Sequence, residues 1–309
     1  MMRNQPNIVV VGSFIMDLVF RTYRRPNRGE TVIGSEFGMF TGGKGYNQAI
    51  AASRLGANVT MVGCVGIDLF GDMFISSLKK DGVGINYVLR NPTVGTGVAC
   101  PVIDESEGDN SIIIVPRANL TLTPDHIESA SSLIATADML MLQLEIPMET
   151  SMRAAEIAHA AGVPVMLNPA PFSKLPDHFY QLIDIITPNE IEASQLTGIQ
   201  IDNIETVKQV GKSIRTLGPK IVVVTLGQRG AYYLDSKEEI QVPAFKVNTL
   251  DPTAAGDAFC AGFAVAISRG QKPIYAVQMG NAAGGLATTV LGAEPSLPKL
   301  EQVLTLLKQ

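Results

Sequence analysis

Short runs of β-branched and other apolar residues recur along the chain and alternate with longer stretches of helical periodicity. The strand-like runs are Ile8–Val11, Val59–Gly63, Met139–Leu142, Val163–Asn168, Ile183–Thr187 and Ile221–Thr225. Several are apolar almost throughout, as in strands covered on both faces. Helical patterns between and after them include Pro124–Ala135 behind an N-cap at Thr123, Ile204–Leu217 and Leu300–Leu307. This alternation predicts an α/β fold with a doubly wound, mostly parallel sheet flanked by helices.

Two segments, Phe14–Phe40 and Gly95–Pro116, interrupt this rhythm with strand-like alternation and turn signals but no good helix. Glu107-Gly108-Asp109-Asn110 is typical of a hairpin turn. Neither segment buries both faces alone, so together they predict a small β-sheet lid over an active-site mouth, with apolar area left for a partner subunit. Residues 1–13, 41–94 and 117–309 then form the α/β core, and residues 14–40 and 95–116 form the lid.

Composition narrows the class of partner. The 309 residues are 46% hydrophobic with a formal net charge of −5, which argues against nucleic acid or an anionic membrane as the main partner. No apolar run approaches the ~20 residues of a membrane span, and Met1-Met2-Arg3-Asn4 precedes no secretory apolar region. Three cysteines in apolar surroundings fit free thiols in a reducing compartment. We therefore expect a cytoplasmic protein.

The stretch Thr253-Ala254-Ala255-Gly256-Asp257 carries the most chemical information. Its small residues leave successive backbone N–H groups bare. If a helix begins there, its first-turn donors and positive dipole end converge on one point, which suits a phosphate. Asp257 would lie beside the bound anion, where a general base for an attacking hydroxyl is needed. An ordinary loop-to-helix junction with an acidic first turn explains these residues equally well.

A second cluster, Thr41-Gly42-Gly43-Lys44-Gly45-Tyr46-Asn47-Gln48-Ala49, precedes a helix of small residues that Gly56 closes. The Gly-Gly pair suits a hinge or a close approach to a ligand, and Lys44 and Asn47 can hydrogen-bond to hydroxyls. Taken alone, the cluster indicates no more than a flexible loop.

The order of these elements, with Gly12-Ser13 and Asp17 ahead of the second cluster and Gly256-Asp257 far behind it, resembles the ribokinase family, the PfkB carbohydrate kinases. The resemblance runs from Ile8 to Pro298. It implies ATP-dependent phosphorylation of a primary hydroxyl of ribose or a related pentose or furanose. Asp257 would be the general base, Ala255, Gly256 and Asp257 would form an anion hole, and the lid would join two subunits in a homodimer.

The resemblance also implies the contacts to the sugar: Asp17, Gly43, Lys44, Asn47 and Glu145. Glu145 has an alternative role as the cap of a strand end. Two positions depart from the pattern. Ribokinases normally have Asn where this chain has Ile15, and usually Ala where it has Tyr46. An aliphatic Ile15 removes a hydroxyl partner and leaves room for an apolar edge, and we expect Tyr46 to add bulk next to Asn47.

Further site residues follow from the resemblance alone. Asn189 and Glu192, in the Asn-x-x-Glu element, would organise Mg²⁺ and phosphate largely through water. The nucleotide contacts would come from Asn189, Thr225, Gly227, Gly230 and Asn281. A monovalent cation, K⁺ in this family, would lie among Asp251, Thr253, Ala287, Gly292 and Ser296.

The sequence leaves some alternative functions open and supports others only weakly. A nucleoside kinase, or another furanoside kinase of the same family, is the alternative that Ile15 favours. A non-catalytic sugar or nucleotide sensor is remote, because a sensor would not need Asp257. No G-x-x-x-x-G-K-[ST] loop is present, so a Walker-type kinase is excluded, and no dinucleotide fingerprint supports a dehydrogenase.

Overall fold

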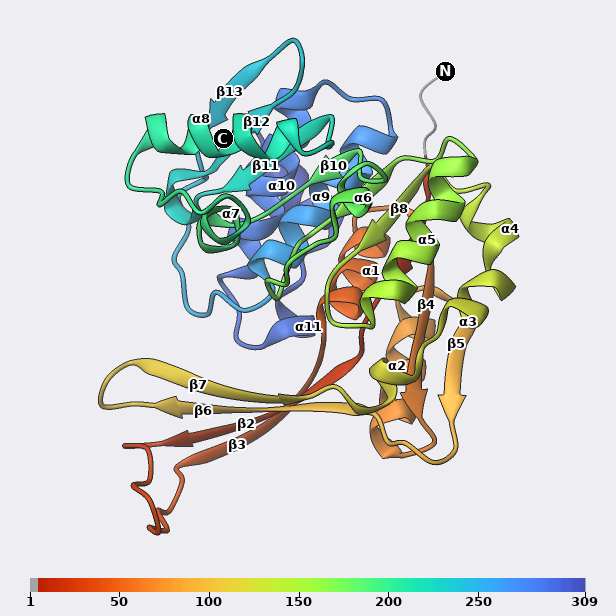
Figure 1. Ribbon diagram of the computed structural model, residues 1–309. Helices are drawn as coiled ribbons and strands as arrows, with labels where there is room; N and C mark the ends of the chain where they lie inside the picture. Colours follow the sequence, from red (N-terminus) through yellow and green to blue (C-terminus); the bar gives the residue numbers. More distant parts are fainter. Residues whose placement is uncertain (1–4, 309) are drawn as a thin grey trace.

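A nine-stranded sheet forms the centre of the protein in the computed structural model, which describes residues 5–308 (Figure 1). Residues 1–4 and 309 of the expected core lie outside the described residues. The strand order is β13-β12-β11-β10-β9-β8-β1-β4-β5. Neighbouring strands are parallel from β11 to β5, and β12 and β13 are antiparallel. The strands are β1 Asn7–Val11, β4 Asn58–Gly66, β5 Gly84–Asn91, β8 Met139–Leu142, β9 Val165–Leu167, β10 Ile185–Ile186, β11 Ile221–Thr225, β12 Ala231–Leu234 and β13 Glu239–Val242.

Helices cover both faces of this sheet, as the apolar strands require. In β1, Ile8 and Val10 enter one hydrophobic core while Val9 and Val11 enter the other. The first core is closed by α1 Lys44–Arg54, α2 Leu69–Lys80, α9 Ala255–Ser268, α10 Pro273–Ala287 and α12 Leu300–Leu306. The second is closed by α3 Pro124–Ser129, α4 Ser131–Ile134, α5 Met148–Ala160, α6 Asp177–Tyr180, α7 Glu190–Thr197 and α8 Ile204–Thr216. The short elements η1 Arg117–Thr121, η2 Gly227–Arg229 and α11 Ala293–Ser296 complete the chain.

Helices α9 and α10 approach each other closely because their facing residues are small. A Cβ added to Gly284 would lie 2.9 Å from the carbonyl oxygen of Ala255, and one added to Gly262 would lie 2.8 Å from that of Met279. This contact holds the first turn of α9 against the body of α10. The residues predicted to form the anion hole therefore lie where α9 packs closely against α10.

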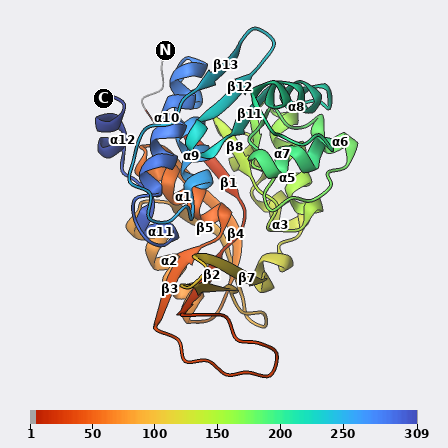
Figure 2. The same cartoon turned by 90° about the vertical axis from the view of Figure 1, so that its left-hand side faces the viewer.

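The lid is a separate four-stranded sheet in the order β3-β2-β6-β7, which projects from the core (Figures 1 and 2). Its strands are β2 Ile15–Thr22, β3 Glu36–Gly42, β6 Gly97–Asp104 and β7 Asp109–Val115. The chain enters β2 directly after the loop that follows β1, and it leaves β3 straight into α1. The predicted α/β fold with a small β-sheet lid is confirmed.

Some predicted elements differ in extent. The helix expected over Pro124–Ala135 is broken at Ala130 into α3 and α4, where serines on both sides support a helix poorly. The strand expected over Ile183–Thr187 is reduced to two residues. Within residues 5–308, no helix is both long enough and apolar enough to cross a membrane.

Candidate functional site

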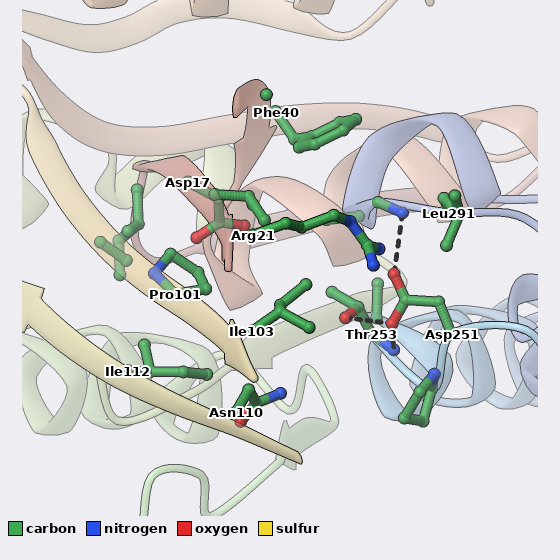
Figure 3. Close-up of a pocket in the computed structure, with 18 of the residues that line it drawn as sticks. Asp17, Arg21, Phe40, Pro101, Ile103, Asn110, Ile112, Asp251, Thr253 and Leu291 are labelled. Atoms are coloured by element: carbon green, nitrogen blue, oxygen red, sulfur yellow. Dashed lines mark hydrogen bonds between the residues drawn. The ribbon is translucent and has the colours of Figure 1, made fainter. Parts of the chain in front are cut away.

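A cavity of about 830 Å³ lies between the lid and the first turns of α1 and α9. Figure 3 shows that Asp17 and Arg21 of β2 and Asp251 and Thr253 of the loop before α9 all line it. Its floor is formed by Gly43, Lys44, Asn47, Glu145 and Asp257. The structure thus brings together all five predicted sugar contacts and the predicted general base, although Asp17 and Asp257 are far apart in the sequence.

The first turn of α9 is uncapped and strained. Its N-cap, Ala254, has a left-handed φ of 60°, which is uncommon for a residue with a side chain, and no side chain caps the helix. A Cβ built on Gly256 meets no atom within 4 Å, so open space lies beside this residue. The amide of Ala255, predicted to be bare, instead donates to the carbonyl of Pro252 at 3.2 Å. In this structure the turn therefore offers the amides of Gly256 and Asp257 to an anion, and that of Ala255 is engaged.

Asp257 is buried, and each of its carboxylate oxygens accepts one amide N–H. Asn47 Nδ2 donates to Oδ2 at 2.9 Å, and Gln48 Nε2 donates to Oδ1 at 3.1 Å. The other end of the Asn47 side chain, Oδ1, is buried without a hydrogen-bond partner among the described residues. An unpaired buried acceptor is costly, so this atom is suited to a hydroxyl donor from a ligand in the cavity.

Lys44 lies among three carboxylates. Burial lowers the pKa of its ammonium group, but Asp257, Glu145 and Glu192 together outweigh burial and raise it. The ammonium is therefore charged at neutral pH, close to carboxylates from both predicted groups of site residues, Glu145 and Asp257 for the sugar and Glu192 for Mg²⁺ and phosphate. This is the arrangement that a transferring phosphoryl group needs.

Glu145 fastens the loop after β1 to the start of α1. Its Oε2 accepts from Ser13 Oγ and from the backbone N–H of Lys44, the latter at 2.8 Å. Burial raises the pKa of Glu145, and Lys44 opposes this rise. Glu145 also lines the cavity. It can therefore hold the end of a strand and contact the sugar at the same time.

Asp17 is a strongly perturbed carboxyl that faces the cavity. Burial, together with the negative charges of Glu145 and Asp251, raises its pKa to about 7. Such a carboxyl changes charge near physiological pH, and its ionised form gains a favourable partner when a polyol donates hydroxyl hydrogens to it. A perturbed carboxyl in a cleft is characteristic of functional sites.

The two departures from the family pattern have different outcomes. Ile15 lines the cavity on the same face of β2 as Asp17. Tyr46 does not, and the expectation that it adds bulk beside Asn47 is wrong. Its hydroxyl bonds to Ser77 at 2.6 Å and to Glu294 at 2.9 Å, and its ring packs on Phe74 on the other side of α1.

The residues expected to contact the nucleotide form two neighbouring groups. Asn189 pairs with Thr225 in a bridge between the ends of adjacent strands. Gly230 and Asn281 meet at the end of β13, where a Cβ on Gly230 would overlap the carbonyl of Val242 and Asn281 Nδ2 donates to that same carbonyl at 3.1 Å. A second, open cavity of about 520 Å³ lies along the segment between β13 and α9 and beside the residues that follow α10. It is lined by residues that the sequence analysis did not identify, Lys246, Val247, Asn248, Leu250 and Thr289.

Asn189 and Glu192 form a reciprocal helix cap. Asn189 Oδ1 accepts from the Glu192 N–H at 2.8 Å, and both Glu192 oxygens accept from Asn189. Burial raises the pKa of Glu192, against the effect of the Asn189 backbone N–H and of Lys44. Because both carboxylate oxygens are already engaged, this pair suits a cation that keeps its water shell, as Mg²⁺ does.

Asp251 joins the loop before α9 to the segment between α10 and α11, and the predicted monovalent-cation residues lie in or beside these segments. Its Oδ1 accepts from the backbone and hydroxyl of Thr253, at 2.9 and 2.6 Å, and its Oδ2 accepts from the Gly292 N–H at 2.9 Å. Ser296 Oγ donates to the carbonyl of Ala293 in α11, and Ala287 is buried at the end of α10. Within residues 5–308, no group of three or more His, Cys, Asp or Glu side chains is arranged to hold a metal ion. A site built largely from backbone oxygens would not need such a group.

Comparison with known proteins places these observations in context. The sequence pattern of the pfkB family of carbohydrate kinases matches residues 5–300. A ribokinase of Staphylococcus aureus is 37% identical over 298 residues, which are 96% of this chain and 98% of that protein. A deoxyribokinase of Salmonella typhi is 35% identical over 306 residues, which are 96% and 97% of the two chains. A structure of Arabidopsis thaliana ribokinase complexed with ribose and ATP superposes with a TM-score of 0.93 at 34% identity, covering 99% of each chain.

Proposed function

The chain belongs to the pfkB family of carbohydrate kinases and is an ATP-dependent sugar kinase, and from this premise we propose that it phosphorylates the primary hydroxyl of a pentose. One observation carries the proposal. The buried carboxylate of Asp257 lies at the floor of the cavity, on the uncapped first turn of α9. A proton acceptor and an anion site therefore occupy adjacent positions, as in-line transfer to a hydroxyl requires.

In the proposed reaction, Asp257 accepts the proton of the primary hydroxyl while that oxygen attacks the γ-phosphorus of ATP. A new P–O bond forms to the sugar, the bond between the γ-phosphorus and the bridging oxygen breaks, and ADP leaves. The amides of Gly256 and Asp257 stabilise charge on the transferring group, joined by that of Ala255 once it leaves Pro252. Lys44 contributes a positive charge next to Asp257.

We propose that Asn189 and Glu192 hold Mg²⁺ through its waters, where the ion would neutralise charge on the phosphates. Thr225, Gly227, Gly230 and Asn281 would border the nucleotide. We further propose that the loops joined by Asp251 bind K⁺, with Thr253, Ala287, Gly292 and Ser296, and thereby fix the geometry of the anion hole. Turnover should then be higher in K⁺ than in Na⁺ at equal ionic strength, and equal rates in buffers with and without K⁺ would contradict this part.

Ile15 is the residue that we expect to select among pentoses. The related proteins include enzymes named ribokinase and deoxyribokinase at 37% and 35% identity, so overall identity does not decide between the two acceptors. An aliphatic side chain leaves a facing hydroxyl unpaired, which costs roughly 1–3 kcal/mol, or about a 5- to 150-fold loss of kcat/KM. We therefore expect 2-deoxyribose to compete well with ribose.

The test measures kcat/KM for ribose and 2-deoxyribose in the wild type and in Ile15→Asn, by ATP consumption. The ratio should move toward ribose in Ile15→Asn and stay unchanged in the control Leu18→Asn, which alters the face of β2 turned away from the cavity. Nucleosides belong in the same panel, because an apolar edge also suits a nucleoside kinase. A wild type that already prefers ribose to every deoxy sugar and nucleoside, with no effect of Ile15→Asn, would overturn the assignment.

We also propose that residues 14–40 and 95–116 act as a lid that closes over the sugar and that two lids meet in a homodimer. The face of the lid turned away from the cavity carries exposed apolar side chains, among them Phe20, Met39 and Ile113. Exposed apolar area of this kind is typical of a protein interface. A cytoplasmic location fits the free thiols of Cys64, Cys100 and Cys260.

A further inference from the structure

A chain of buried side-chain amides reaches Asp257 from the side opposite the cavity. Gln48 is 1% exposed and does not line the cavity, yet its Nε2 donates to Asp257 Oδ1 at 3.1 Å. The other oxygen of Asp257 is bonded by Asn47, which does line the cavity. Of the two amides that donate to Asp257, only Asn47 lies where a substrate could contact it, and Gln48 does not.

The orientation of the Gln48 amide is fixed by its neighbours. Gln143, which directly follows β8 and is also 1% exposed, donates from Nε2 to Gln48 Oε1 at 2.7 Å. Gln48 Nε2 lies 3.4 Å from Asn168 Oδ1, and Asn168 Nδ2 in turn donates to the carbonyl of Thr187 at 2.9 Å. The oxygen of the Gln48 amide thus faces a donor, and its nitrogen faces two acceptors. A flipped amide would place an oxygen against Asp257.

Gln143 is itself held tightly in place. A Cβ on Gly12, at the end of β1, would lie 2.2 Å from Gln143 Oε1, so the glycine makes room for this side chain. The same oxygen is buried without a partner among the described residues. A buried, partly unsatisfied glutamine is costly in a hydrophobic core. Its presence is explained if the hydrogen bond from its Nε2 to Gln48 has a function.

We propose that Gln48 is a positioning residue that holds the Asp257 carboxylate in its reactive orientation, and that Gln143 acts through Gln48 by fixing its amide. This inference rests on the role proposed for Asp257 as general base. Bonds from neutral amides restrict rotation of the carboxylate and leave its proton-accepting direction free toward the cavity. Charged groups around it are Lys44 from α1, Glu192 from α7 and Glu145 from the loop after β8.

The test compares Gln48→Leu, Gln143→Leu and the double variant with the wild type in steady-state sugar phosphorylation. Loss of a hydrogen bond to a charged group should lower kcat roughly 10- to 150-fold. KM for sugar and ATP should change by less than about threefold, because neither glutamine touches a substrate. Since Gln143 acts through Gln48, its substitution should cost little in the Gln48→Leu background. Multiplying losses in the double variant, or a change confined to KM, would overturn the proposal.

Gln143→Met keeps the length of the side chain but has no hydrogen-bond donor, and it serves if a leucine variant fails to fold. Without a donor to its oxygen, the Gln48 amide is no longer fixed, so kcat should again fall. The control Ser151→Ala removes a buried polar group on α5, which covers the face of the sheet opposite α1 and α9, and should leave kcat unchanged. Asp257→Asn is measured in parallel. If it keeps turnover, the proposed base fails; if it alone loses turnover, only the role of the glutamines fails.

Discussion

Replacing Asp17 by Asn removes a cavity carboxyl whose pKa is raised to about 7, and the consequence for activity is calculable. Only the ionised form accepts hydrogen bonds from sugar hydroxyls through both oxygens. With a pKa of about 7, the ionised fraction falls from about nine-tenths at pH 8 to about one-tenth at pH 6. Because kcat/KM reports the free enzyme, kcat/KM for the sugar should fall about tenfold over this range.

The same substitution should stabilise the unliganded protein. A folded pKa raised from 3.8 to about 7 means that ionised Asp17 opposes folding. The stability linked to this group is fully present below pH ~4 and is lost as pH rises through about 7. A shift of about three units corresponds to at most ~4 kcal/mol, and partial exposure of Asp17 reduces it. Asp17→Asn should therefore raise the free energy of unfolding at pH 8 by ~1–3 kcal/mol, and by less at lower pH.

The assay follows ATP consumption from pH 5.5 to 8.5 in the wild type, in Asp17→Asn and in the control Asp177→Asn, which alters an exposed carboxylate on α6. Asp17→Asn should lose the acid limb and lower kcat/KM at pH 8 by roughly 10- to 150-fold. Urea unfolding at pH 8 gives the stability change. A flat wild-type profile between pH 6 and 8, or the same acid limb in Asp17→Asn, would refute the reasoning.

Three further predictions separate packing from chemistry. Gly256→Ala should leave the unfolding midpoint unchanged or raise it, because the added Cβ meets no protein atom and alanine favours a helix by up to ~1 kcal/mol. Turnover should nevertheless fall about tenfold or more, because the methyl group would occupy space needed by the anion. Tyr46→Ala should lower the free energy of unfolding by ~3–5 kcal/mol and leave the ratio of kcat/KM for ribose and 2-deoxyribose unaltered; a changed ratio would restore Tyr46 to the pocket. Ile113→Asp, at a lid position 68% exposed in the single chain, should convert a sedimenting dimer to a monomer, whereas Ile274→Asp on α10 should not; a monomeric wild type would exclude the lid dimer.

The sequence was informative where one local pattern determines one structure. The apolar runs at β1, β8 and β11 predicted strands because burial on both faces leaves little choice of residue. The first turn of α9 was recognisable because its small residues and one acid are consecutive. Its engaged Ala255 amide was not, because a turn back to Pro252 depends on the left-handed conformation of Ala254.

Side-chain direction and long-range polar contacts were harder to predict. Tyr46 and Asn47 are adjacent in sequence, but neighbouring residues of a helix point about 100° apart, so Tyr46 faces Ser77 while Asn47 faces the cavity. Helical geometry alone is enough to predict that the two side chains point in different directions. No local signal connects Gln48 with Gln143, because their contact depends on packing α1 against the end of β8.

The central claim is phosphoryl transfer to a pentose hydroxyl with Asp257 as the base, and it is tested most directly by comparing wild type and Asp257→Asn on the better of the two pentoses. Product formation is followed by ³¹P NMR, which also identifies the phosphorylated oxygen. The wild type should give phosphate on the primary hydroxyl. Asp257→Asn should lower turnover by the ~10²–10⁴ of a lost general base, with KM for the sugar changed far less. No sugar phosphate from either pentose, or near-normal turnover in Asp257→Asn, would contradict the account.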